Sequence, residues 1–188
     1  MEKVVARIKN ILMNPEAALD ELKSESMNIT TVMKEYVAIA AVVPGAAMFI
    51  GLIGNAPLFR ALLYGALIYA ICVAGVLGFG KLLDALAPHF GSTKNDESAF
   101  KVSLAAFTPS FVAGIVNINP NLSFLWVLGS LYGCYIVYLG LPKLMNTPED
   151  KRIAYSAASC AAIGIVVFIL WRVAKGIALG DFSYSFSY

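Results

Sequence analysis

Charged side chains are scarce in this sequence. Only 14% of its 188 residues are Asp, Glu, Lys or Arg, whereas 59% are hydrophobic. A soluble domain carries about 25% charged residues, and a soluble domain of this length would have too much surface to cover with so few charges. Surrounding most of the chain with lipid removes this difficulty. The shortage therefore excludes an ordinary soluble domain and predicts a membrane protein with a single domain.

Residues for catalysis and metal binding are also few. The one histidine, His89, follows Pro88 in a predicted loop, and the three cysteines, Cys72, Cys134 and Cys160, lie in apolar runs. The sequence has no nucleophile-elbow, phosphate-loop or zinc-protease motif. The cysteines lack the spacing of a disulfide framework or zinc site, so we expect them to pack as small core residues. We predict that the protein is not an enzyme and has no catalytic, cofactor or metal site and no nucleic-acid partner.

Long apolar runs are the main feature that is present. A helix needs about 20 apolar residues to cross a hydrocarbon layer ~30 Å thick. No run alternates polar and apolar residues as the wall of a membrane barrel must. The fold class is therefore all-α, a polytopic bundle with a short amphipathic helix at its N-terminus. We predict an N-terminal segment 1–31, a transmembrane domain 32–176 with spans 36–54, 58–80, 99–118, 121–142 and 153–174, and an aromatic tail 177–188.

Prolines mark helix starts and bends. Asn14 before Pro15, and Thr147 before Pro148, are each typical of an N-cap followed by a residue that needs no backbone donor. The second pattern places a turn between spans four and five. Four residues form a candidate kink site within spans one and three: Pro44, Thr108, Pro109 and Ser110. Kinks there would improve packing, with neighbouring groups satisfying the freed carbonyls. Alternatively, broken helices at mid-depth would expose carbonyls to an ion or solute.

Basic residues are distributed unevenly between the two sides. With the N-terminus inside, eleven Lys and Arg fall on the inner side and three on the outer side. Basic loop residues favour the cytoplasmic side, so we expect a multi-pass protein of the inner (plasma) membrane with a cytoplasmic N-terminus and an outward-facing tail. The inner set is Lys3, Arg7, Lys9, Lys23, Lys34, Lys81, Lys94, Lys101, Lys143, Lys151 and Arg152, and the outer set is Arg60, Arg172 and Lys175.

Residues 1–13 have the pattern of an amphipathic helix. Apolar side chains fall on one face, and Lys3, Arg7 and Lys9 lie elsewhere. Such a helix lies on an anionic leaflet, so these three basic residues are candidates for membrane-surface binding. The alternative is a short helix packed against the cytoplasmic loops. The apolar face comprises Val4, Ile8, Ile11 and Leu12.

Small residues recur at four-residue spacing. Helices associate in lipid largely through close backbone packing, which small residues permit. We therefore expect a tight bundle with span two near its centre, although such faces could instead join two copies of the chain. The candidate packing residues are Ala66, Ala70, Ala74 and Gly78 in span two, Gly129 and Gly133 in span four, and Ala157 and Ala161 in span five.

Two segments carry a family resemblance. In "AFKVSLAAFTPSFV", Phe100 and Lys101 precede a span with Pro109, and "LYGCYIVYLGLPKLMNTPEDKRIAY" closes a span before a charged turn. With Asn14-Pro15-Glu16 ahead of span one, these features resemble bacterial-type members of the Yip domain family, the Ypt-interacting-protein-like membrane proteins, over about residues 5–175. The resemblance implies five spans and a cytosolic N-terminus. Eukaryotic members are linked to Rab-type GTPases, but their Asp-Leu-Tyr-Gly-Pro segment and long N-terminal tail are missing here.

These observations predict a non-enzymatic inner-membrane protein that binds partners or organises the membrane through its cytoplasmic face. The alternative is a small-solute or ion transporter that uses the proline-broken spans. The lipid bilayer is the expected partner, with protein partners at the cytoplasmic face and a second copy of the chain as further candidates. Carboxylates on that face could converge on a divalent cation. They are Glu16, Asp20, Glu21, Asp96, Glu97, Glu149 and Asp150.

Overall fold

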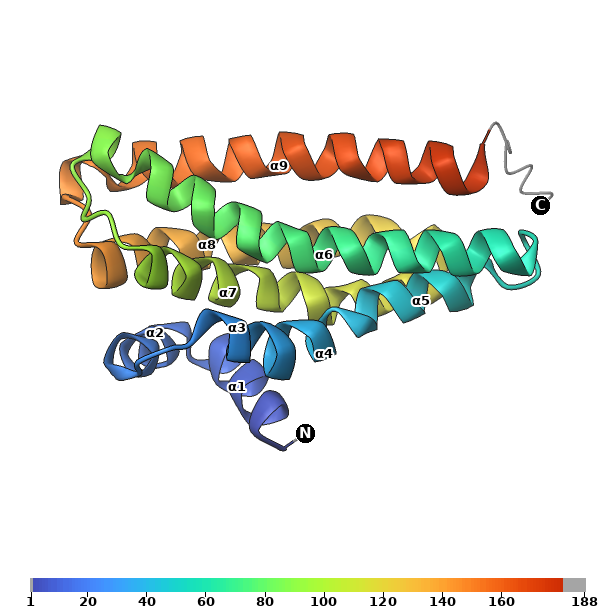
Figure 1. Cartoon of the computed structure of the whole chain (residues 1–188), viewed down its shortest axis with the longest axis horizontal. Helices are drawn as coiled ribbons and strands as arrows, with labels where there is room; N and C mark the ends of the chain where they lie inside the picture. Colours follow the sequence, from blue (N-terminus) through green and yellow to red (C-terminus); the bar gives the residue numbers. More distant parts are fainter. Residues whose placement is uncertain (1, 181–188) are drawn as a thin grey trace.

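The computed structural model describes residues 2–180, and these form a bundle of long helices (Figure 1). Five helical segments are long and apolar enough to cross a membrane, which confirms the predicted all-α polytopic fold. The predicted aromatic tail lies mostly outside the described residues, although its first three residues continue the last helix. The five segments are Ile29–Leu52, Leu58–Phe90, Asp96–Ile118, Asn121–Met145 and Glu149–Leu179.

The elements follow one another in an up-and-down order along the bundle. Two short helices precede the spans, and the first span is divided by a π-helical turn and a break. The N-terminal helices are α1 (Glu2–Met13) and α2 (Pro15–Ser24), and the first span comprises α3 (Ile29–Val32), η1 (Met33–Val37), α4 (Ala38–Ala40) and α5 (Val42–Leu52). The remaining elements are α6 (Leu58–Leu86), η2 (Ala87–Phe90), α7 (Asp96–Ala113), η3 (Gly114–Ile118), η4 (Pro120–Leu125), α8 (Trp126–Met145) and α9 (Glu149–Leu179).

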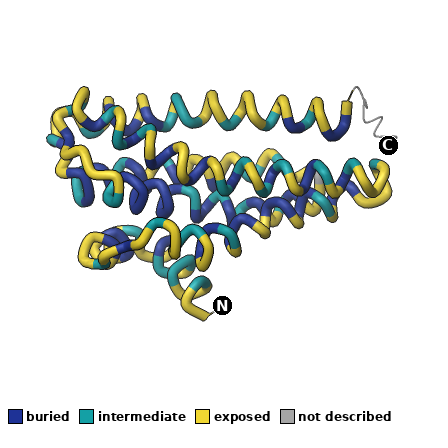
Figure 2. The backbone as a smooth tube through the Cα atoms, in the orientation of Figure 1, coloured by how far each residue is buried: buried dark blue, intermediate teal, exposed yellow. Residues whose placement is uncertain are grey.

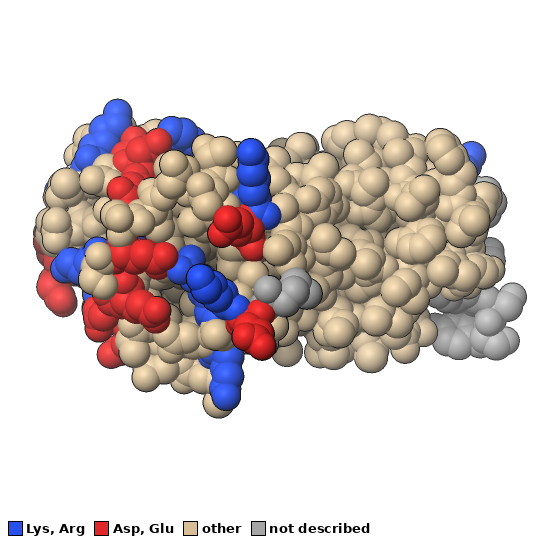
Figure 3. Space-filling model, turned by 60° about the horizontal axis from the view of Figure 1, so that its bottom comes forward, with Lys and Arg blue, Asp and Glu red and all other residues tan. Residues whose placement is uncertain are grey.

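The two ends of the bundle differ in charge. We call the end formed by α1, α2 and the connections 87–95 and 146–148 the head end. The opposite end, formed by the connection 53–57, by η3 and η4, and by the last turns of α9, is the far end. On the face shown in Figure 3, acidic and basic side chains gather over the head end and the adjoining region, and the rest is almost uncharged. This separation is typical of a protein whose apolar part lies in lipid and whose charged part lies in water.

The centre of the bundle is α7, not span two as the small-residue spacing predicted. In the third span, 67% of the most apolar 18-residue stretch is buried. The corresponding shares are 39% in the second span and 17% in the fifth. Figure 2 shows the same contrast, with α9 exposed along most of its length. The reason is that α7 lies between α6 and α8 and also meets α1, α2 and α5. The most hydrophobic span, the fifth, is thus also the least buried one, because lipid can cover it.

The structure confirms one of the two predicted N-caps, corrects the other, and locates the interruption of span one. The Asn14 side chain caps α2 by accepting from the Ala17 N–H at 3.4 Å, as predicted. Thr147 does not cap α9: it is buried, and its hydroxyl accepts from Ser92 at 2.9 Å. The helix of span one is interrupted at Ala41, and Pro44 lies in the first turn of α5. A proline lacks the donor for the carbonyl four residues earlier and crowds it, so the interruption precedes Pro44.

Candidate functional site

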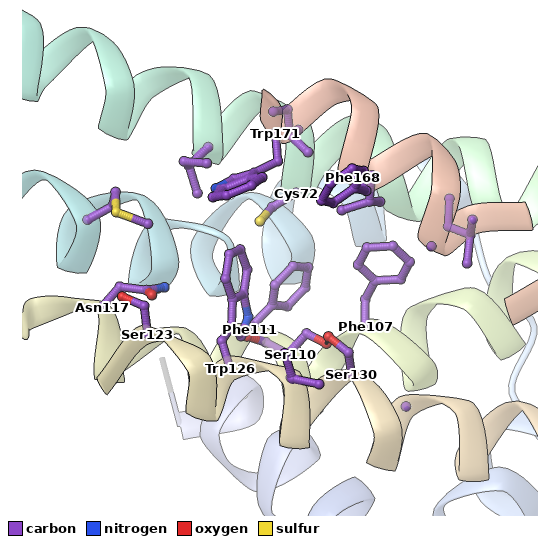
Figure 4. Close-up of a pocket in the computed structure, with 18 of the residues that line it drawn as sticks. Cys72, Phe107, Ser110, Phe111, Asn117, Ser123, Trp126, Ser130, Phe168 and Trp171 are labelled. Carbon is purple, nitrogen blue, oxygen red and sulfur yellow. Dashed lines mark hydrogen bonds between the residues drawn. The ribbon is translucent and has the colours of Figure 1, made fainter. Parts of the chain in front are cut away.

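A cavity of about 600 Å³ lies between the helices towards the far end of the bundle (Figure 4). Residues from α5, α6, α7, α8 and α9 and from the short helices η3 and η4 line it. Its walls are mostly apolar. The volume is within the roughly 300–1,000 Å³ of small-molecule sites, which combine apolar walls with a few placed polar groups. Among the described residues, it is the most developed candidate for a binding site.

Aromatic side chains form much of the wall. The two tryptophans of the chain, Trp126 on η4–α8 and Trp171 on α9, both line the cavity, together with Phe107, Phe111 and Phe168. The Trp126 indole is held in place, because its Nε1–H donates to the Ser110 carbonyl at 2.7 Å. Aromatic walls of this kind offer a large apolar surface that is fixed in position. They are suited to an aliphatic chain more than to a hydrated ion.

A few polar groups interrupt this wall. Ser110 and Ser130 lie 3.4 Å apart, hydroxyl to hydroxyl, and Asn117 and Ser123 lie near the far end (Figure 4). Asn117 is fully buried, and both polar atoms of its amide lack a hydrogen-bond partner among the described residues. A buried amide without a partner costs about 1–3 kcal/mol. This amide is therefore the strongest polar anomaly of the cavity.

The predicted kink site is not gathered into one place. Of its four residues only Ser110 lines the cavity. The Thr108 hydroxyl donates to the Leu104 carbonyl at 2.9 Å and accepts from the Tyr36 hydroxyl at 2.8 Å, so its hydrogen bonds are made within a buried contact. Pro44 packs tightly against Gly114, and α7 stays helical through Pro109. This arrangement favours the packing interpretation of the prolines over an exposed carbonyl site.

The predicted small-residue faces behave differently from one another. Gly129 and Gly133 are buried against α7, where a methyl group on Gly129 would lie 2.8 Å from the Pro109 carbonyl oxygen. The span-two set faces outward instead, and a methyl group on Gly78 would meet nothing within 4 Å. The close α5–α6 contact uses Gly45 and Gly65. The outward-facing set is Ala66, Ala70, Ala74 and Gly78, joined by Ala157 and Ala161 on α9.

Helix α1 packs against the bundle through its apolar face. Ile11 is buried, and Val4 and Ile8 are partly buried against the core. Of the three predicted membrane-binding residues, Arg7 is engaged internally, because its Nη2 lies 2.8 Å from the Glu25 carboxylate. The opposite face of α1 is open: Val5 is 61% and Met13 77% exposed. Lys3 and Lys9 are also exposed.

A buried lysine fastens the α2–α3 connection to α7. Lys101 is 5% exposed, and its Nζ lies 2.8 Å from Glu97 and donates to the Glu25 carbonyl. Glu97 in turn accepts from the Met27 N–H at 2.8 Å. Farther along the head end, Lys143 on α8 pairs with Asp20 on α2 at 2.8 Å. The head end is therefore attached to the bundle by charged groups as well as by apolar contacts.

The histidine and the three cysteines lie in different parts of the bundle. His89 is exposed in η2 at the head end. Cys72, Cys134 and Cys160 are free thiols, and all three line the cavity. Within residues 2–180, no three His, Cys, Asp or Glu side chains are placed to hold a metal ion together.

Comparison with known proteins identifies the group to which this bundle is related. A sequence model of the Yip1 domain matches residues 9–170, which is most of the chain. The chain belongs to the Yip1 domain family. It is also 22% identical over 177 residues to the inner membrane protein YohC of Escherichia coli K12, covering 87% of this chain and 90% of the relative, and equally similar to YohC of E. coli O6:H1. No solved structure matches it. The predicted resemblance is thus confirmed, and the similarity agrees with an integral inner-membrane protein.

The sequence did not reveal the cavity of this Yip1-family chain. Its one detectable signal was Asn117, an amide within the predicted span 99–118 that lipid would penalise and that no expected partner satisfied. Most of the other lining residues are apolar and have the same composition as a packed interior. Whether these residues enclose a cavity depends on the distance of α9 from α7 and α8. The amino-acid sequence alone does not give that distance.

Proposed function

We propose that this Yip1-family protein is a non-enzymatic inner-membrane protein that organises the membrane or binds partners through its head end. The observation that carries the proposal is the outer face of α1, which combines exposed Lys3 and Lys9 with exposed Val5 and Met13. Figure 1 shows α1 leaving the flank of the bundle, with its N-terminus away from the other helices. Basic and apolar side chains on one exposed face are suited to the headgroup region of an anionic leaflet.

The head end also offers a surface for a protein partner. A groove of about 340 Å³ lies between α2, α8 and the start of α9, and two acidic and two basic side chains are among its lining residues. A partner would recognise this groove by complementary charge, which gives specificity and fast association more than affinity. Its charged lining residues are Glu16, Lys143, Glu149 and Arg152.

The proposed orientation places the head end in the cytoplasm. Among residues 2–180, every Asp and Glu lies in the segments 2–35, 84–97 or 149–150, whereas the far end carries Arg60, Arg172 and Lys175. We expect a membrane-impermeant maleimide to label an Asn121→Cys variant, made without the native cysteines, from outside intact cells. Lys94→Cys should react only after permeabilisation. Labelling of Lys94→Cys alone in intact cells would show the opposite topology.

The membrane contact of α1 is tested by measuring its depth. A spin label at Val5→Cys, in a chain without its native cysteines, should be more accessible to oxygen and less accessible to a water-soluble nickel complex in nanodiscs that contain phosphatidylglycerol than in phosphatidylcholine nanodiscs. Lys3→Glu with Lys9→Glu should reverse the change, because each basic residue near an anionic surface contributes about 1 kcal/mol.

A spin label at a second exposed position serves as the control for the Val5 label. Ser26→Cys, which is exposed on the α2–α3 connection, should remain water-accessible in both nanodiscs. The proposal for α1 is wrong if the Val5 label is as water-accessible as the Ser26 label in both lipid compositions.

A further inference from the structure

We propose that the far-end cavity is a binding site for an anionic glycerophospholipid from the adjoining leaflet. One acyl chain would lie along the aromatic wall, and the polar head would meet Asn117 and Lys175. The inference is independent of the role proposed for the head end. It rests on an unpartnered amide, an opening towards lipid, the length of the cavity and the charge of its surroundings.

Asn117 identifies the polar part of the site. Its amide is 0% exposed, lines the cavity, and has both Nδ2 and Oδ1 unpartnered within residues 2–180. An amide both donates and accepts a hydrogen bond. A ligand group that satisfies it therefore carries an acceptor and a donor close together. The ester and hydroxyl groups of a glycerol-based lipid head supply this pair.

The cavity opens sideways between α8 and α9. Val127 on α8 is 57% and Phe168 on α9 60% exposed, and both line the cavity. Gly164 on α9 lines it as well and is exposed, with nothing within 4 Å of where a methyl group would stand. This part of α9 lies within a predicted membrane span, so the opening faces hydrocarbon. Lipid can enter there without leaving the bilayer.

The length of the cavity fits an acyl chain. Along α9 its lining extends from Cys160 to Lys175, and at 1.5 Å of rise per residue these positions are about 22 Å apart. The hydrocarbon of one leaflet is about 15 Å thick, half of the full layer. An acyl chain that starts near the far end would therefore remain within the lined region. The apolar part of such a space accepts apolar ligands.

The charge of the far end favours an anionic head. Lys175 lines the cavity, with its Nζ 5.6 Å from the centre of the Trp171 ring. Arg60 and Arg172 also belong to this end, and the described residues there include no Asp or Glu. Within residues 2–180, the charged side chains of the far end are therefore all positive, and Lys175 is the one that lines the cavity and would meet a phosphate. Phosphatidylglycerol, which combines a phosphate with hydroxyl groups, matches both the cations and the amide.

The two tryptophans provide a direct measurement. We would titrate the delipidated, detergent-solubilised full chain with phosphatidylglycerol brominated on its acyl chains, which quenches indole fluorescence on contact. The expected result is saturable quenching at one lipid per chain. Gly164→Phe, which fills the opening, should weaken the apparent affinity about tenfold or more. Gly176→Phe is the matched control, because Gly176 is on the same helix, is exposed, has equally open space and does not line the cavity.

Two further variants test the polar contacts. Asn117→Leu should weaken lipid binding about tenfold, the loss of one to two hydrogen bonds. It should not lower the melting temperature of the lipid-free protein, because the amide has no partner within residues 2–180 to lose. Lys175→Met should abolish the preference for phosphatidylglycerol over brominated phosphatidylcholine. Equal quenching in Gly164→Phe and Gly176→Phe would overturn the site, since it would show lipid on the outer surface only. Unchanged binding by Asn117→Leu would assign the amide to water and overturn the proposed head contact.

Discussion

Replacing Gly133 by alanine is expected to lower the free energy of unfolding by about 2–3 kcal/mol, in the upper part of the range for overpacking a close contact. A methyl group there would collide with the Ala106 carbonyl oxygen on α7. Helix backbone is not a flexible side chain that can rotate aside, so α7 and α8 would have to separate. This pair forms the most extensive helix contact of the bundle. Thermal unfolding in detergent, followed by circular dichroism, measures the change.

Gly78→Ala is the matched control for this prediction. Gly78 also lies in a membrane-spanning helix, but a methyl group on it meets nothing within 4 Å. Alanine has the higher helix propensity by about 1 kcal/mol, so the control should be neutral or slightly stabilising. Equal destabilisation by the two substitutions would contradict the structure at the α7–α8 contact. A neutral effect of Gly133→Ala would do the same.

The contrast between Gly133 and Gly78 also shows how far the sequence could be read. Gly129 and Gly133 lie in a close contact with α7, whereas the equally regular set from Ala66 to Gly78 faces outward. In a soluble helix the polar face marks the outside. In a membrane helix both faces are apolar, because lipid is as apolar as the protein interior. Four-residue spacing therefore indicates that close packing is possible on a face, and the other helices decide whether it occurs.

The same reasoning explains why the spans were predictable and the candidate site was not. Span number and approximate bounds follow from the length of apolar runs, a property of each segment alone. The cavity is a property of several segments together. Trp126 and Trp171 are 45 positions apart in the sequence, yet they line one space because the fold brings α8 and α9 to the same cavity. For the same reason, the sequence of the third span alone does not show whether the Asn117 amide finds a hydrogen-bond partner.

Lys101→Met is expected to loosen the attachment of the head end while leaving the membrane-spanning helices in place. Methionine keeps the apolar stem of this buried residue but removes the ammonium group that contacts Glu97 and the Glu25 carbonyl. A hydrogen bond from a charged donor contributes about 1.5–3 kcal/mol, so backbone amide exchange in the α2–α3 connection, residues 25–28, should rise roughly 10- to 100-fold. Hydrogen–deuterium exchange of the full chain in nanodiscs, followed by mass spectrometry, measures this change.

An exposed ion pair supplies the control for Lys101→Met. Lys81 lies 2.6 Å from Asp96, but their side chains are 70% and 48% exposed. Exposed pairs contribute at most about 1 kcal/mol, so Lys81→Met should change amide exchange only a few-fold. An equal rise in both variants would mean that the burial of Lys101 has no energetic consequence. A rise spread evenly over α8 and α9 would mean that Lys101 supports the whole bundle. Only a rise confined to the connection and the adjoining helices α1 and α2 shows that this one buried cation fastens the head end to α7.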